Sequence, residues 1–484
     1  MRSPEMIPES VERELGRLIP GWPQARLCIA LSGGVDSAAL LQACHGIRAR
    51  LPAVKLRAIH VAHGLQPTAA HWPAICAALC ASLEVPFETI ELQLAPPPGA
   101  SVEASARDAR YAALQSRLAR GEALLTAHHQ DDQLETVLLQ LFRGAGLAGI
   151  AAMPASAPFG HGLLLRPLLS VTRAEIDAYA HAAGIGRIED PMNLSPRFDR
   201  GLLRREVIPV LRARWPAVAR TVSRTARHAA TAQGLLDDLA AIDAADGTSE
   251  DRLLVARCLT LPRARQANLL RWWLQSCGLG MPSEARLHSI LDDLLPARPG
   301  AQPVVTWPTG EVRRHRGWLH AMQPLGPVVG KAWTLAAGET IEAEGVGSIA
   351  LVAGTGCGFS VLRYPGPFEL RIRQGGERIL PAGHRAEKSV TRLLREAGTE
   401  SWLRDRVPLI YCRDSLLAVG ERWIAATAAA TAGEPGLVVR WTRGVRHKPA
   451  LPQPETRPGS VRASVRRSQG TARRNGLQDR TPRR

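Results

Sequence analysis

The sequence contains little lysine and no long apolar run. Only four of its 61 basic residues are lysines, so almost all of its positive charge is arginine, whose planar guanidinium suits phosphate. No stretch of eighteen apolar residues occurs, and we therefore expect no membrane-spanning helix. The first fourteen residues are acidic and have no apolar core, which argues against a signal peptide. Together these absences predict a cytoplasmic protein in a reducing compartment.

Paired cysteine motifs are also absent. The eight cysteines are scattered, and Cys76 and Cys80, four residues apart, have no second pair or histidine cluster nearby that would complete a metal site. We expect both to be buried free thiols.

The length and the charge distribution indicate several domains and a basic tail. With 484 residues and a prior of roughly 150 residues per domain, about three domains are expected. Residues 443–484 hold 12 basic and two acidic side chains, and so carry ten of the seventeen net positive charges. This stretch is rich in proline and poor in large apolar residues, so we expect it to be disordered. It either attracts an RNA backbone nonspecifically or is an extension without a dedicated task.

A glycine-rich loop joins two apolar runs, 27–31 and 38–41, which predicts a strand, a tight turn and a helix. Its backbone N–H groups and two serine hydroxyls lie at a helix start, where an anion is favoured. No lysine follows, so a kinase-like phosphate loop is disfavoured, and the aspartate instead suggests Mg²⁺ bound beside phosphates. The residues of the loop are Ser32, Gly33, Gly34, Val35, Asp36 and Ser37.

Three further apolar runs, at 56–62, 86–92 and 123–127, alternate with helical segments and predict βαβ units in a parallel sheet. Ligands bind beyond the carboxyl ends of such strands. His63 follows one run, and the dense polar segment His128–Thr136 follows another. The acids of that segment lie in the first turns of a predicted helix, where they could simply cap it. Capping does not explain the two adjacent histidines.

The segment Glu103–Tyr111 predicts a helix on which Glu103, Arg107 and Arg110 share one face. These residues form either an ordinary salt-bridge stripe or an arginine face that receives pyrophosphate or RNA phosphate.

The loop resembles the pyrophosphate-binding loop of ATP pyrophosphatases, and the motifs taken in order resemble the bacterial tRNA(Ile)-lysidine synthetases. The resemblance covers roughly residues 25–430. It is carried by the segments Ser32–Ser37, His60–Leu65, Glu103–Tyr111, His128–Thr136, Arg143–Gly146, Arg166–Leu169, Glu189–Asn193, Phe198–Arg200, Gly375–Arg378 and Trp402–Leu409.

This resemblance implies an α/β fold with a doubly wound, Rossmann-like parallel sheet of the adenine nucleotide alpha hydrolase type. It implies a PP-loop catalytic domain at 1–215, a mainly helical tRNA-binding domain at 216–325 and a small α+β tRNA-recognition domain at 326–442. The basic tail at 443–484 lies outside it.

The resemblance also implies a reaction. ATP and Mg²⁺ would adenylate the 2-oxo group of the wobble cytidine in the CAU-anticodon tRNA(Ile), and the ε-amine of free L-lysine would then displace AMP. The implied catalytic residues are Asp36, His63, Arg107, His129 and Asp132, with Asp36 and Asp132 as metal ligands. The implied substrate-binding residues are Glu103, Arg110, Asp131, Glu135, Arg143, Arg200, Arg204, Lys388, Trp402, Arg404 and Arg406. Which group deprotonates the lysine is left open among His63, His129, Asp131 and Glu135, and a homodimer is left open as well.

Three positions depart from the family pattern. Gly201 stands where asparagine is usual, Thr391 precedes Arg392 where a further lysine is common, and Glu421 follows Gly420 in place of a second small residue. Three alternatives to the lysidine synthetase are a tRNA thiolase, a small-molecule amidotransferase-type synthetase, and an RNA-binding protein that kept the fold and lost catalysis. The lack of paired cysteine motifs disfavours the thiolase.

Deletion of residues 443–484 tests the role of the tail. We expect the shortened chain to bind tRNA more weakly at low salt and to keep its chemical step, because the tail would act through nonspecific charge. Titration of tRNA binding against salt, with turnover at saturating tRNA, measures both. Loss of turnover at saturating tRNA would contradict the prediction.

Overall fold

The computed structural model describes residues 6–62, 71–92, 102–186, 199–245, 247–249, 251–298, 300–328 and 332–443. His63, the loop at 187–198 and the tail beyond 443 lie outside these residues, as does the side chain of Glu103. Arg443, expected to open the tail, is instead the last residue of a strand. Within the described residues, no helix combines the length and the apolar character needed to cross a membrane.

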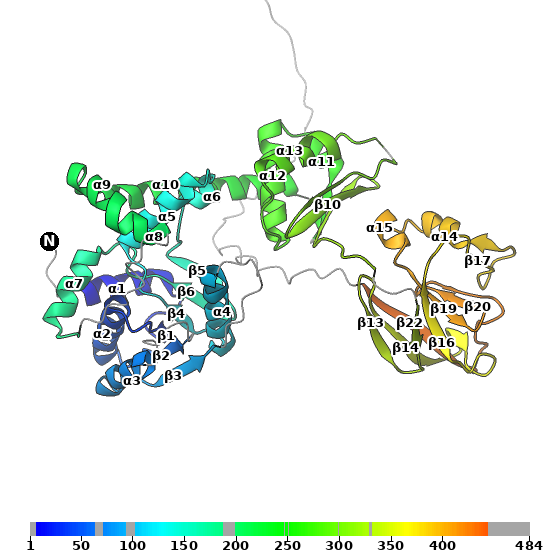
Figure 1. The fold of residues 1–484 in the computed structure, drawn as a ribbon, viewed down its shortest axis with the longest axis horizontal. Coiled ribbons are helices and arrows are strands. Elements are labelled where there is room, and N and C mark those ends of the chain that lie inside the picture. Colours follow the sequence, from blue (N-terminus) through cyan, green and yellow to red (C-terminus); the bar gives the residue numbers. More distant parts are fainter. Residues whose placement is uncertain are drawn as a thin grey trace, which may run out of the picture. The chain divides into compact units, whose positions relative to one another are not determined.

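The first domain is built on a six-stranded sheet in the order β3-β2-β1-β4-β6-β5 (Figure 1). The first five strands of this order are parallel, and β5 is an antiparallel edge. The strands are β1 (Arg26–Ala30), β2 (Lys55–Ala62), β3 (Phe87–Glu91), β4 (Ala123–Leu125), β5 (Ser156–Phe159) and β6 (Gly162–Leu165). The doubly wound parallel sheet predicted from the alternating runs is therefore confirmed.

Helices cover both faces of this sheet. Successive strand residues alternate between two cores: Leu27 and Ile29 pack with α1, α2, α3 and α7, whereas Cys28 packs with α4. Buried Ile7, Val11 and Leu15 hold α1 in the first core, a 3.6-residue pattern. These helices are α1 (Met6–Leu18), α2 (Val35–Arg50), α3 (Trp72–Ser82), α4 (Val102–Arg117) and α7 (Arg173–Ala182).

Further helices complete this part of the chain: α5 (Gln130–Phe142), α6 (Leu147–Ile150), α8 (Asp199–Leu202), a π-helical turn η3 (Leu203–Val207), α9 (Ile208–Arg214) and α10 (Val218–Ala244). Cys76 and Cys80 on α3 are buried free thiols, as expected.

The middle region adds a sheet to the expected helices. It contains α11 (Val255–Leu259), α12 (Arg263–Ser276), α13 (Glu284–Ser289) and a π-helical turn η4 (Ile290–Leu294). A five-stranded antiparallel sheet, ordered β7-β8-β11-β10-β9, packs with them around Trp273. Its strands are β7 (Thr248–Ser249), β8 (Arg252–Leu254), β9 (Val304–Trp307), β10 (Gly310–His315) and β11 (Trp318–Met322). Strands β10 and β11 form a hairpin, in whose turn Arg316 and Gly317 both adopt positive φ, 46° and 83°.

The C-terminal domain is α+β, as expected. A five-stranded and a four-stranded sheet share one core with α14. The elements are β12 (Ala332–Leu335), β13 (Thr340–Ala343), β14 (Gly347–Thr355), β15 (Phe359–Ser360), β16 (Phe368–Ile372), β17 (Arg378–Ile379), β18 (Lys388–Ser389), α14 (Val390–Glu396), α15 (Ser401–Arg404), β19 (Pro408–Cys412), β20 (Ser415–Val419), β21 (Trp423–Ile424) and β22 (Pro435–Arg443).

Candidate active site

The glycine-rich loop connects β1 to the start of α2. Gly33 has a φ of 90°, and a Cβ there would lie 2.3 Å from the Trp72 ring, so both conformation and space require glycine. The hydroxyls of Ser32 and Ser37 lie 3.0 Å apart, and Ser37 donates to the Gly34 carbonyl at 2.9 Å. The loop is thus a rigid turn at the N-terminus of a 16-residue helix, a geometry that favours an anion.

Asp36 has one committed and one free carboxylate oxygen. Its Oδ2 accepts a hydrogen bond from Arg173 Nη1 at 3.1 Å and lies 3.9 Å from His129 Nε2. Its Oδ1 is buried and has no hydrogen-bond partner among the residues that the structure describes. Burial raises the pKa of Asp36, against the lowering effect of His129 and Arg173. A buried orphan oxygen of this kind is suited to a cation or a water molecule that the phosphates bring with them.

His129 caps α5 and also connects it to the loop. The His129 Nδ1 accepts a hydrogen bond from the backbone N–H of Asp131 at 3.3 Å, and the backbone N–H of His129 donates to Asp132 Oδ2 at 3.0 Å. These interactions belong to a capping box at the start of α5. The His129 Nε2 lies 3.5 Å from Asp132 Oδ2. The capping explanation considered for these acids is therefore correct for Asp132, and it places His129 between Asp36 and Asp132.

The acids of α5 are buried and paired with arginines from later segments. Asp131, Asp132 and Glu135 are only 7%, 8% and 2% exposed. Arg204 in the π-helical turn donates from Nη2 to Glu135 Oε2 at 3.0 Å and to Asp132 Oδ1 at 3.1 Å. Arg212 on α9 pairs with Asp131. Buried carboxylates are tolerated only with such partners.

The pKa values of Asp132 and Glu135 are shifted in opposite directions. Burial opposes the ionisation of Asp132, but the charge and backbone N–H of His129 outweigh it and lower the pKa of Asp132. Burial raises the pKa of Glu135 in spite of Arg204. Neighbouring acids whose pKa values shift in opposite directions are typical of sites that both bind cations and move protons.

Three arginines act on His128, the residue that precedes His129. Burial, followed by the charges of Arg166, Arg110 and Arg107, lowers the pKa of His128 to about 4, although Asp132 acts against them. Arg166 is 7% exposed and donates from Nη1 to the Pro154 carbonyl at 2.8 Å. The arginine face predicted on α4 therefore lies close to the polar segment after β4.

Two further predicted site residues, Arg143 and Arg200, have contacts at α5 or near it. Arg143 is exposed and 3.6 Å from Asp199, and Arg200 reaches Thr136 Oγ1 at 3.5 Å. In the C-terminal domain, Lys388 pairs with Glu396 at 3.0 Å, and Arg406 donates to the Gly326 and Gly345 carbonyls.

Trp402 and Arg404 have internal partners as well. Trp402 contacts the rings of His320 and His315 at centroid distances of 5.2 and 5.8 Å. Arg404 donates to the Thr399 carbonyl at 2.9 Å. The structure therefore does not bring these C-terminal residues to the loop.

The residues at the loop fit the expected Mg²⁺ ion. The described residues contain no group of three or more His, Cys, Asp or Glu side chains that could enclose a metal ion. Asp36 and Asp132 both flank His129, and Asp36 offers a free oxygen. Mg²⁺ commonly takes one or two carboxylates and completes its shell with phosphate and water, so this donor set is sufficient.

Three site residues are absent from the sequence prediction: Arg173, Arg212 and Arg166. Arg173 and Arg212 carry no local motif, and only the fold places them against Asp36 and Asp131. Arg166 follows an apolar strand, in the position where ligand residues were sought, and could have been found there.

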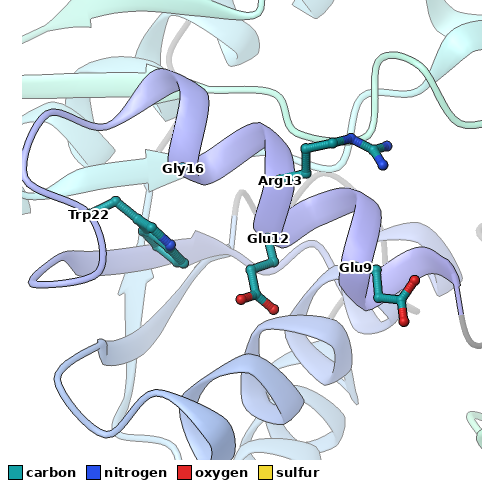
Figure 2. A pocket seen from close by; sticks show the side chains of 5 residues that line it. All are labelled: Glu9, Glu12, Arg13, Gly16 and Trp22. Carbon is teal, nitrogen blue, oxygen red and sulfur yellow. The ribbon is translucent and has the colours of Figure 1, made fainter.

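A surface hollow lies elsewhere on the first domain. It has a volume of about 470 Å³ and lies against α1, where Glu9, Glu12, Arg13, Gly16 and Trp22 line it (Figure 2). None of the predicted site residues lines it, and its Glu12 is already paired with Arg50. We therefore place the site at the loop and α5.

Comparison with known families agrees with this architecture. The PP-loop domain matches residues 7–211, the TilS substrate binding domain residues 253–320, and the TilS substrate C-terminal domain residues 368–441. The chain is 41% identical over 429 residues to tRNA(Ile)-lysidine synthase from Methylococcus capsulatus, covering 87% of this chain and 97% of that protein. It is 40% identical over 400 residues to the protein of the same name from Coxiella burnetii, covering 82% and 88%.

Among solved structures, the U34-tRNA thiolase NcsA from Methanococcus maripaludis aligns with a TM-score of 0.40 and 16% identity, over 46% of this chain and 77% of that one. At this level of similarity it adds no argument about activity.

The neutral state of His128 predicts a dependence of stability on pH. Its pKa is about 4 when folded and 6.5 as a free side chain, so the unfolded chain binds more protons between these values. The stability that the neutral His128 contributes to the folded state is fully present above pH 6.5 and is lost as the pH falls towards 4. We expect His128→Gln, which lacks this titration, to lose less unfolding free energy than wild type between pH 7 and 5, by on the order of 1–2 kcal/mol. Urea unfolding at both pH values measures it, and parallel losses in the two proteins would contradict it.

Proposed function

The chain belongs to the tRNA(Ile)-lysidine synthase family, and we propose that it ligates free L-lysine to the 2-oxo position of the wobble cytidine of the CAU-anticodon tRNA(Ile). ATP is converted to AMP and pyrophosphate, and the product anticodon reads AUA in place of AUG. The observation that carries this proposal is the direct connection of the PP-loop, through Asp36 and His129, to a buried set of carboxylates on α5.

ATP binds on the loop Ser32–Ser37 in this proposal. The helix N-terminus and the serine hydroxyls receive phosphate oxygens, while Asp36 and Asp132 would hold Mg²⁺. The ion supplies charge neutralisation for the departing pyrophosphate. The charges of Arg107 and Arg110 act on His128, so both are suited to assist, and the exposed Arg143, 3.6 Å from Asp199, is a further candidate.

The first step makes the cytosine reactive. The 2-oxo oxygen attacks the α-phosphorus, the bond to the β-phosphate oxygen breaks, and pyrophosphate leaves. The base oxygen, a poor leaving group, thereby becomes part of an AMP ester, which is a good one. Donors fixed in advance around the phosphates lower this barrier because they need no reorganisation.

The second step requires a neutral amine. The lysine ε-ammonium is attracted to the carboxylates of α5 and must lose a proton before its nitrogen attacks C2 and AMP leaves. Glu135 is the group best suited to accept that proton, because burial raises its pKa towards neutrality. All three groups have partners, Glu135 in Arg204, Asp131 in Arg212 and His129 in the α5 cap, so the raised pKa is what distinguishes Glu135.

The middle and C-terminal domains bind the tRNA in this proposal, and the protein acts in the cytoplasm. The homodimer remains a prediction from the sequence.

One assay tests the reaction. Full-length protein is mixed with ATP, Mg²⁺, labelled L-lysine and CAU-anticodon tRNA(Ile), and lysine incorporation and ATP–pyrophosphate exchange are both measured. Wild type should do both, and Asp36→Asn should lose exchange at least a hundredfold while keeping its fold by circular dichroism, since its free oxygen would hold the metal.

Three results would contradict the proposal. Tight tRNA binding without incorporation would indicate an RNA-binding protein that has lost catalysis, and transfer of sulfur would indicate a thiolase. Retained exchange in Asp36→Asn would remove Asp36 from the metal site.

A further inference from the structure

Arg173, the first residue of α7, holds the carboxylate of the phosphate loop and contacts a second carboxylate as well. Its Nη1 donates to Asp36 Oδ2 at 3.1 Å, and its Nε donates to Asp177 Oδ1, one turn further along α7, at 3.3 Å. The Arg173 side chain is 37% exposed. Ion pairs of partly exposed arginines are weak, so this guanidinium can exchange one partner for another at little cost.

The backbone that carries Arg173 is fixed beside the site. The Arg173 N–H donates to Asp131 Oδ2 at 2.7 Å, and Thr172 caps α7 in a capping box. The turn before α7 is joined to the start of α5, since the N–H of Gln130 donates to the Val171 carbonyl at 2.8 Å. None of these contacts uses the Arg173 guanidinium, so a substitution of this side chain leaves them in place.

Asp36 has two cations that compete for its charge. It pairs with Arg173, and it is also the residue expected to hold Mg²⁺. A metal ion on Asp36 removes the charge that attracts Arg173 and repels the guanidinium over a short distance. The phosphates that arrive with the ion offer oxygens that a guanidinium fork binds well. Because Asp36 belongs to the loop itself, an arginine that reaches Asp36 is also close to an anion bound on the loop.

The other arginines paired with acids of α5 are less suited to such an exchange. Arg204 and Arg212 pair with Glu135 and Asp131, which are only 2% and 7% exposed. Removing the partner of a buried carboxylate leaves an uncompensated charge. The side chain of Asp36 is 25% exposed, and it would gain a metal ion as the guanidinium leaves it.

We propose that Arg173 is a phosphate-binding residue of the first step, held on Asp36 until ATP arrives and then bound to the β- or γ-phosphate. Asp177 keeps its contact with the Arg173 Nε in both positions. The guanidinium thereby offsets the charge of Asp36 before binding and that of the departing pyrophosphate during the reaction. The proposal rests on the proposed function for the position of ATP on the loop.

The test measures the affinity of the full-length chain for ATP, inorganic pyrophosphate and AMP without Mg²⁺, by displacement of a fluorescent ATP analogue in EDTA. Arg173→Gln should weaken the binding of ATP and of pyrophosphate about tenfold, the loss expected for one charge-assisted contact to phosphate. AMP lacks the β- and γ-phosphates, so its affinity should stay within about twofold of wild type. An equal loss for all three ligands would indicate damage to the loop and would count against the proposal.

A second substitution separates a contact to phosphate from simple neutralisation of Asp36. In a chain that already carries Asp36→Asn, no carboxylate charge remains at this position for Arg173 to offset. A contact to phosphate predicts that Arg173→Gln still weakens ATP binding about tenfold in this background. Unchanged ATP affinity there would show that Arg173 serves only Asp36, and would overturn the proposal.

Two further variants complete the comparison. Arg173→Lys keeps a positive charge but lacks the planar fork, and it should bind ATP and pyrophosphate more tightly than Arg173→Gln and less tightly than wild type. Arg50→Gln is the matched control, since Arg50 lies at the other end of α2 from Asp36 in an exposed ion pair with Glu12. It should change each affinity less than about twofold.

Failure of the proposed function gives a different result from failure of this inference. If wild type binds ATP and pyrophosphate but incorporates no lysine, the proposed function fails, whereas the affinities of the variants still report on Arg173. If wild type binds neither ligand, ATP does not lie on the loop and both fail.

Discussion

The ion pairs between the buried carboxylates of α5 and arginines from later segments are the interactions on which the catalytic edge depends. Arg204 and Arg212 meet acids that lie 69 to 81 positions earlier in the chain. Removing one partner of such a pair leaves an uncompensated buried charge, at a cost of about 3–5 kcal/mol. These pairs therefore fix α5 against the π-helical turn and α9, and with them the carboxyl end of β4.

This network extends to the phosphate loop through a single side chain. His129 lies between Asp36 and Asp132, while Arg173 links Asp36 to the start of α7, where its own N–H also donates to Asp131 Oδ2 at 2.7 Å. A change of charge at the loop is consequently felt by the acids of α5. The arrangement leaves one oxygen, Asp36 Oδ1, without a partner, and this is the position at which a ligand-borne cation would complete the site.

Much of the first domain could be predicted from sequence because its signals are local. Apolar runs of strand length predicted β1 to β4, and polar residues after those runs identified the edge where the site lies. Arg173 and Arg212 could not be predicted, since no motif surrounds them and only the packing of α7 and α9 brings them to Asp36 and Asp131. Arg204 itself was expected to bind substrate, but the π-helical geometry of the turn that carries it could not be predicted.

The C-terminal residues show a different limit of sequence reasoning. Lys388, Trp402 and Arg406 were predicted from the family motifs to bind substrate; their side chains have internal partners in the structure, and substrate binding by them stays a prediction. A motif identifies residues that matter without separating those that build a surface from those that bind at it.

A crystal structure of the full-length chain with a non-hydrolysable ATP analogue and Mg²⁺ tests the central claim most directly. The triphosphate should lie against Ser32–Ser37, with the metal about 2.0–2.1 Å from Asp36 Oδ1. A triphosphate bound elsewhere, such as the hollow beside α1, or a metal with no contact to Asp36, would contradict it.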